Sequence, residues 1–253
     1  MIPKKRFIQT GLFVCLVMMI IGFQPGYAKN FQGTLTFNMG FPQEEFQENV
    51  DRVALGIQLG GNYRLGHSPF LIGAEIGVMT YGRDKRVEYV SNFPDINSNL
   101  GIDVVHDYNM VQGGVYLRFQ PQHRGIVKPY LDILAGLNYI YTSTSIPTDY
   151  YYDDYYGWGS HSSYHDEYSK TNYDDTSFYY GIGAGFQVPL YRTYPGRRSP
   201  GLLLDVRARY TRGGEATYLT KGSIIVDNTK VTYIISKSHT DLIVLQAGVT
   251  FSF

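Results

Sequence analysis

The chain has 253 residues, with 22 basic and 22 acidic residues, so its formal net charge is zero. Charged residues make up only 17% of it, whereas about 25% is usual in soluble domains. Aromatic residues reach 15%, including 24 tyrosines, and the mean hydropathy is −0.20. This composition excludes a bundle of apolar helices, gives no indication of a nucleic-acid partner, and favours β structure.

The first 28 residues have the pattern of a secretory signal peptide. A basic start is followed by an apolar run from Leu12 to Phe23, and the small residues Gly26 and Ala28 suit cleavage after Ala28. The run is shorter than the ~20 residues of a helical membrane anchor. We therefore predict a signal peptide at 1–28 and a mature domain at 29–253, which contains no cysteine for disulfide or thiol chemistry.

Eight stretches of the mature chain alternate between apolar and other residues, as half-buried β-strands do. They run from Phe31 to Phe41, Val53 to Tyr63, Phe70 to Val78, Val111 to Phe119, Leu131 to Tyr141, Phe178 to Val188, Leu202 to Tyr210 and Ile243 to Phe253. Each is about ten residues long, which suits a tilted strand that crosses a bilayer.

The connections between these stretches alternate in length. The short ones are "LGHSP", "QPQHRG" and "YRTYPGRRSPG". The others are a medium loop near "PQEEFQENV" and long loops at about 82–104, 143–176 and 218–239. This alternation predicts an all-β, eight-stranded antiparallel up-and-down transmembrane β-barrel, with both termini and the short turns at one end.

The face opposite the apolar one is rich in glycine, which a narrow barrel interior requires and a solvated surface does not. It also carries arginines and carboxylates among glutamines, and buried charges persist only when they are paired. We predict that these residues fill and staple the lumen. The charged members are Arg52, Glu75, Arg118, Asp132, Asp205, Arg207 and Arg209.

The apolar face has no charged residue at its central positions, and its aromatic residues fall near the strand ends. Two aromatic belts around an aliphatic band are typical of a transmembrane barrel. A secreted lipocalin-like carrier also has eight alternating strands, but its apolar face points inward. The two alternatives differ in whether residues such as Leu55, Ile133, Val206 and Leu245 face outward or converge on a central cavity.

From about Phe31 to Phe253 the chain resembles the small eight-stranded outer-membrane barrels of the OmpA/OmpX kind, a group often labelled porin-like. The resemblance rests on the signal peptide, the strand count, the loop asymmetry and the closing "VTFSF". It implies an outer membrane of the Gram-negative type, lipid around the barrel, and a C-terminal signal that the barrel assembly machinery reads. The matching positions are Leu245, Ala247, Val249, Phe251 and Phe253.

The segment 149–175 is acidic and rich in tyrosine, and it contains the only tryptophan. Tyr, Ser, Gly and Asp are favoured in adaptable binding loops, although a hydrophilic loop without a ligand has the same composition. The candidate surface-recognition residues are Tyr151, Tyr152, Tyr155, Tyr156, Trp158 and Tyr164. His161 and His165, beside Asp166 and Glu167, have metal-ligand chemistry, but their spacing suits a helix and not this loop, so we predict no metal site.

Catalysis would need a nucleophile within hydrogen-bond reach of a base, and His106, His239, Ser236 and Ser238 are the candidates. Nothing in the sequence marks them out, so we predict no enzyme and no cofactor. We expect a monomeric barrel with a structural or surface-recognition role, an unidentified surface ligand and no open pore. The alternatives are a small-solute channel and the lipocalin-like carrier.

Overall fold

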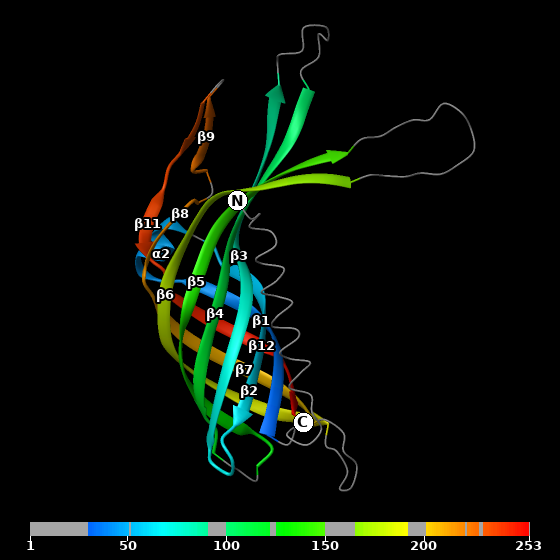
Figure 1. The fold of residues 1–253 in the computed structure, drawn as a ribbon, viewed down its shortest axis with the longest axis vertical. Helices are drawn as coiled ribbons and strands as arrows, with labels where there is room; N and C mark the ends of the chain where they lie inside the picture. The colour runs from blue at the N-terminus through cyan, green and yellow to red at the C-terminus, as the bar shows by residue number, and fades with distance from the viewer. Residues whose placement is uncertain are drawn as a thin grey trace, which may run out of the picture.

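The computed structural model describes residues 30–50, 52–90, 100–121, 125–149, 165–191, 201–220, 222–227 and 230–252. Eight strands form one closed antiparallel barrel in the order β1-β12-β7-β6-β5-β4-β3-β2 (Figure 1). They are β1 Phe31–Pro42, β2 Ala54–Arg64, β3 Phe70–Val90, β4 Leu100–Phe119, β5 Lys128–Asp149, β6 His165–Tyr191, β7 Gly201–Gly213 and β12 Leu242–Ser252. The predicted fold class is confirmed. The predicted signal peptide lies outside the described residues.

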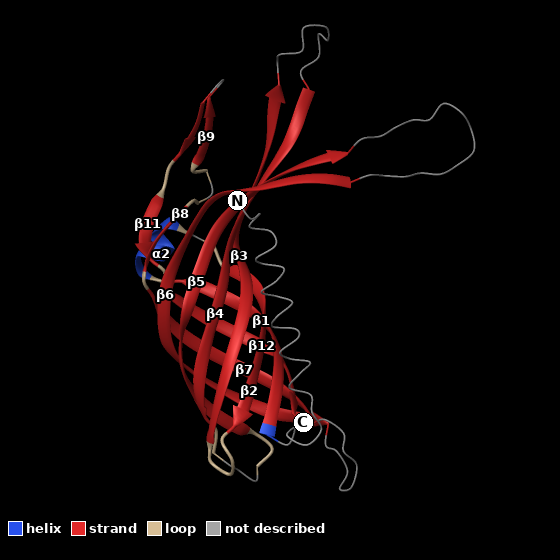
Figure 2. Cartoon of the chain, viewed as in Figure 1, coloured by secondary structure: helices blue, strands red, loops and turns tan. Residues whose placement is uncertain are grey.

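The remaining elements lie in the connections at the end opposite the short turns (Figure 2). The loop after β1 contains the short helix α2, Glu44–Asn49. The connection from β7 to β12 contains two hairpins, in which β8 (Glu215–Tyr218) pairs with β11 (Ser236–His239) and β9 (Ile224–Asp227) pairs with β10 (Lys230–Tyr233). No helix in the described ranges is long and apolar enough to span a membrane.

The register of the strands sets the width of the barrel. The paired residues can be followed once around the barrel, from each strand to the next. A path that starts at Phe31 of β1 and passes Tyr63 of β2 returns to β1 at Phe41, which is ten residues further along the chain. With a rise of about 3.3 Å per residue and about 4.7 Å between strands, this stagger tilts the strands by ~41° and gives a radius of ~8 Å. Side chains alone fill an interior of that width.

Two of the predicted long loops are wrong in extent. β3 and β4 stay paired up to Val90 and Leu100, and β5 and β6 stay paired up to Asp149 and His165. The pairing of β4 with β5 ends earlier, at Val105 and Ser145. The β3–β4 and β5–β6 hairpins therefore separate above the barrel, where Figure 1 shows them pointing apart. The sequence pattern missed these extensions because period-two hydrophobicity disappears where both faces of a hairpin meet water.

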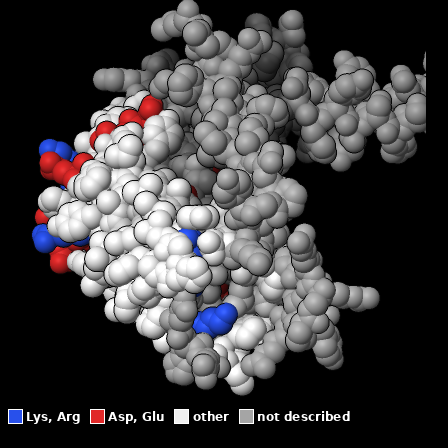
Figure 3. Space-filling model, turned by 60° about the horizontal axis from the view of Figure 1, so that its bottom comes forward, with Lys and Arg blue, Asp and Glu red and all other residues white. Residues whose placement is uncertain are grey.

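The apolar side chains of the strands point outward. Leu55, Ile133 and Leu245 are 48%, 65% and 44% exposed. These side chains do not converge on a central cavity, so the lipocalin-like alternative is wrong. Figure 3 shows an almost uncharged belt on the described surface, with basic and acidic groups gathered toward the ends. Aromatic residues meet near the ends of the belt, as where the rings of Phe70 and Phe119 lie 5.4 Å apart.

Gly248 marks a close approach at the pairing of β12 with β1. A Cβ atom at this position would lie 2.0 Å from the carbonyl oxygen of Leu35, whereas a Cβ at Gly33 on β1 would meet no atom within 4 Å. We expect Gly248→Ala to lower the free energy of unfolding by about 1–3 kcal/mol through overpacking, and Gly33→Ala to leave it unchanged. Urea unfolding of both variants checks this, and equal midpoints would contradict it.

Candidate functional site

The interior of the barrel holds a network of buried ion pairs. Arg118 of β4 donates from Nε and Nη2 to the two carboxylate oxygens of Asp132 on β5, at 2.8 and 3.0 Å. Arg209 of β7 reaches the same carboxylate from Nη2 at 3.1 Å, and its Nη1 donates to Glu75 of β3. The network therefore joins β3, β4, β5 and β7 across the lumen.

Two further residues complete this network. Arg207 of β7 lies 3.7 Å from Glu75, and Asp205 lies 3.7 Å from Nη1 of Arg118. The side chains of these three arginines and three carboxylates are no more than 6% exposed. Their formal charges balance, which is the condition under which buried ions are tolerated.

Neutral polar side chains surround the carboxylate of Asp205. Tyr130 donates a hydrogen bond to it, as do Gln187 at 2.8 Å and Thr250 at 3.1 Å. The guanidinium of Arg118 lies 3.5 Å from the centre of the Tyr130 ring, within range of a cation–π contact. The sequence interpretation did not single out Tyr130, although it occupies the same inward register as Asp132.

Arg52 is the one predicted lumen residue that the structure places elsewhere. It is exposed and lies outside the strands, before β2 begins at Ala54. The prediction was wrong because it carried the alternation of β2 past the first residue of the strand. The other six predicted residues lie together inside the barrel.

An apolar cap closes the loop side of the interior. Its members come from α2, from the start of the β7–β12 connection, and from the inward register of the upper barrel. They are Phe46, Val50, Ala54, Met79, Tyr81, Tyr108, Met110, Ile140, Ala216, Tyr218, Leu219, Leu242 and Val244, all buried. Phe46 and Tyr218 are each 1% exposed, and their rings meet edge to face with centroids 5.3 Å apart.

The cap was not predicted, although the sequence contains a signal for it. Met79, Met110, Ile140 and Leu242 are apolar residues on the register that is otherwise polar. Their shared position near the loop ends of the strands indicates that apolar loop residues cover the interior there.

Asp175 of β6 holds the cap to the barrel wall. Its Oδ2 accepts hydrogen bonds from the backbone nitrogen of Thr217 at 2.8 Å and from Thr217 Oγ1 at 2.6 Å, and its Oδ1 accepts one from the Thr176 nitrogen at 2.8 Å. Partial burial raises the pKa of this carboxyl, but these bonds outweigh it and leave the pKa below its ordinary value. Asp175 lies beyond Phe178, above the apolar belt.

We expect Asp175→Asn to destabilise the protein at pH 6 and to have less effect as the pH falls. A carboxyl with a lowered folded-state pKa stabilises the fold above its unfolded pKa, and that contribution disappears as the pH falls through the folded value. Urea unfolding of wild type and variant between pH 6 and pH 3 checks this. Glu215→Gln, at an exposed pair with Lys237, serves as the control. A pH-independent difference for Asp175→Asn would contradict the assignment.

The predicted surface residues, metal ligands and C-terminal signal are only partly described. Tyr151, Tyr152, Tyr155, Tyr156, Trp158, Tyr164, His161 and Phe253 lie outside the described residues. His165, Asp166 and Glu167 lie on β6, where they pair with Asp149, Thr148 and Pro147. Within the described ranges, no group of three or more His, Cys, Asp or Glu could hold a metal ion. Leu245, Ala247, Val249 and Phe251 follow the outward register of β12.

The candidate catalytic residues lie on two strands. His106 lies on β4, with Nδ1 2.7 Å from Thr144 Oγ1. His239, Ser236 and Ser238 lie together on β11. Ser238 Oγ lies 2.7 Å from the Tyr218 hydroxyl, and His239 Nδ1 lies 3.3 Å from the Gly213 carbonyl oxygen. Of these contacts, the one made by Ser238 reaches the cap, through Tyr218.

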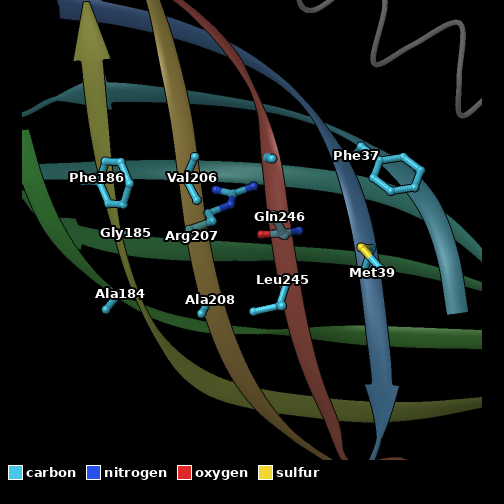
Figure 4. Close-up of a pocket in the computed structure, with 11 residues that line it drawn as sticks. Phe37, Met39, Ala184, Gly185, Phe186, Val206, Arg207, Ala208, Leu245 and Gln246 are labelled. Atoms are coloured by element: carbon cyan, nitrogen blue, oxygen red, sulfur yellow. The ribbon is translucent and has the colours of Figure 1, made fainter. Parts of the chain in front are cut away.

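The outer wall is hollowed on one side, over β6, β7, β12 and β1. A groove of about 470 Å³ opens there, and Figure 4 shows Val206 between Phe186 and Phe37, with Ala184, Ala208 and Leu245 in a row below them. The outward-facing side chains that line it are apolar. The chemistry of these outward-facing side chains suits hydrocarbon.

No family model matches the chain, and no curated protein matches it in sequence. Among solved structures, it is similar to Neisserial surface protein A, at 13% identity over 88% of this chain and 96% of that one, with a TM-score of 0.41. It is also similar to Ail, the attachment invasion locus protein of Yersinia pestis, at 12% identity over 88% and 97% of the two chains (TM-score 0.35). For a major outer membrane protein of Thermus thermophilus the identity is 10% over 88% and 99% (TM-score 0.36).

Proposed function

We propose that the protein is an integral β-barrel of an outer membrane of the Gram-negative type, with a structural or surface-recognition role. The observation that carries this proposal is the outward apolar belt on a barrel whose interior is polar. A monomeric protein in water would aggregate through such a belt, whereas the acyl chains of outer-membrane lipid match it. A signal peptide at residues 1–28 would direct the chain to that membrane.

The position of Ile133 provides the test of this location. It is 65% exposed and lies near the middle of the apolar belt. We expect Ile133→Arg to cost about 2–4 kcal/mol of stability at the midplane of a bilayer and to reduce the folded protein recovered in the outer-membrane fraction. Ile235→Arg is the matched control, because Ile235 is 50% exposed between β10 and β11 and outside the belt.

Fractionation of cells and heat-modifiable gel migration measure both variants. Wild-type protein in the soluble fraction would overturn the membrane location. Equal recovery of Ile133→Arg and wild type would show that water, and not lipid, surrounds the belt.

The proposed barrel has no open pore. The charge-balanced network and the apolar cap, which occupy successive levels of the lumen, support this. A small-solute channel is the alternative, since protein barrels of the porin kind conduct. Purified protein in planar bilayers distinguishes the two, and steady conductance at neutral pH would favour the channel.

Recognition in this proposal belongs to the loop side, where the β3–β4 and β5–β6 hairpins extend beyond the barrel. The tyrosine-rich segment between β5 and β6, with Trp158, would contact an unidentified surface ligand. Protease treatment of intact cells tests the exposure of this segment, with cuts expected within 143–176. We propose no enzymatic reaction, no nucleic-acid partner and a monomeric state, with the C-terminal strand serving the assembly machinery.

A further inference from the structure

The turn-side mouth of the lumen carries two basic side chains, at the end opposite the cap. Arg64 is the last residue of β2 and Lys128 is the first residue of β5. Each follows the inward register of its strand, and each is partly exposed. In Figure 3, which brings this end forward, basic groups lie beside a hollow in the surface.

Arg64 is held in one position by neutral acceptors. Its Nη1 donates to the Ser68 carbonyl oxygen at 3.3 Å and its Nη2 to Gln120 Oε1 at 2.9 Å. Gln120 is 2% exposed and is itself fixed, because its Nε2 donates to Gln187 Oε1 at 3.0 Å. A guanidinium has five N–H donors, so these contacts position Arg64 and leave three donors for another group.

Neither basic side chain has a carboxylate partner among the residues that the structure describes. The two residues lie on the same side of the mouth, because Lys128 pairs with Gln187 of β6, Gln187 accepts a hydrogen bond from Gln120, and Gln120 accepts one from Arg64. The nearby carboxylate of Asp205 is already engaged by Tyr130, Gln187 and Thr250 and lies next to Arg118. The three turn sequences, 65–69, 120–127 and 190–200, contain no acidic residue at all.

This mouth therefore differs from the rest of the interior. Every arginine of the lumen network has a carboxylate within 4 Å, whereas the pair at the mouth has none in the described ranges. Two like charges that are partly removed from water and lack a counter-ion destabilise the fold. An anion between them would reverse that effect.

We propose that Arg64 and Lys128 form a binding site for a phosphate group at the turn-side mouth of the barrel. A phosphate offers several acceptor oxygens that match the planar donors of a guanidinium, while an ammonium adds a point charge. Two sources supply this chemistry: the headgroup of an anionic phospholipid in the facing leaflet, and free inorganic phosphate. The phospholipid source rests on the membrane location proposed above, and the inorganic source does not.

The test uses the full mature chain, purified in an uncharged detergent and titrated by calorimetry with two probes. One probe is short-chain phosphatidylglycerol and the other is inorganic phosphate. We expect saturable binding by wild type, and binding at least about tenfold weaker by Arg64→Gln/Lys128→Gln, because the variant loses both charge-assisted contacts to the phosphate. Arg83→Gln/Lys237→Gln removes two cations at the loop side, each paired there with a carboxylate, and should bind as wild type does.

The outcomes separate the two sources and the two proposals. Binding of phosphatidylglycerol alone assigns a lipid headgroup, and competition by inorganic phosphate assigns a site for either source. Equal affinity of wild type and the mouth variant, or no saturable binding of either probe, overturns the site. A water-soluble protein that still binds inorganic phosphate would overturn the membrane location and leave the site intact. Lys128→Gln alone removes no hydrogen bond of the described structure, so it provides the same comparison if the double variant does not fold.

Discussion

Replacing Arg118 with methionine is expected to lower the free energy of unfolding by about 3–5 kcal/mol, because it leaves buried carboxylates without their cation. Arg118 is 0% exposed, makes the bidentate pair with Asp132 and lies 3.7 Å from Asp205. Among the residues that the structure describes, only Arg209 would still donate a hydrogen bond to Asp132. The large effect arises from the carboxylates that remain and not from the intrinsic strength of the ion pair.

Urea unfolding in detergent micelles, followed by gel mobility, measures this effect. Arg83→Met is the matched control, because the pair of Arg83 with Asp107 has the arginine side chain 70% exposed and such pairs contribute about 0.2–1 kcal/mol. A second variant, Arg118→Met/Asp132→Leu, should recover part of the loss by removing both charges. If Arg118→Met cost no more than the control, the interior would be more hydrated than this geometry indicates.

Replacing Phe46 with alanine is expected to cost about 3–5 kcal/mol and to loosen the cap, because a large buried aromatic side chain is lost. Phe46 comes from a helix of six residues, which is too short to persist without tertiary contacts. Its ring packs on Tyr218 at 5.3 Å and on Tyr81 at 6.1 Å. We expect proteolysis to become faster in the connection between β7 and β12.

The same variant separates the two barriers in the lumen. The network of Arg118, Arg209 and their carboxylates lies below the cap, so Phe46→Ala should remain non-conducting in planar bilayers. Ile235→Ala, at an exposed site in the same connection, should behave as wild type in both assays. Steady conductance of Phe46→Ala would show that the cap alone closes the barrel and would favour the channel alternative.

The sequence predicted the strands correctly within the barrel, where one face of each strand is apolar and the other is polar. Ile133 and its neighbours alternate because apolar side chains face outward and packed polar groups face inward, which makes strand number and direction readable. Beyond Val78 and Tyr141 that contrast disappears, so the paired extensions of β3 to β6 were interpreted as loops. The start of β2 is predicted too early for a related reason, so the prediction that Arg52 faces the lumen is wrong.

The interior was predictable in composition and only partly in arrangement. Charges on a glycine-rich register indicated a paired network, and six of the seven named residues lie there. Which arginine faces which carboxylate depends on the ten-residue stagger, which no single strand encodes. The cap depends on contacts between α2 and the β7–β12 connection, where Phe46 and Tyr218 come from segments with no periodic pattern.

The link between Glu75 and Arg209 has a consequence for how the barrel is made. These residues stand on β3 and β7, 134 positions apart, and they meet only across a finished cylinder. In an incomplete, open sheet Glu75 and Arg209 would each lack the other as a partner. Arg118 and Asp132 are register partners on neighbouring strands and can pair within one hairpin, but Glu75 and Arg209 can pair only once the sheet has curled, so the last interior charges are neutralised late in assembly.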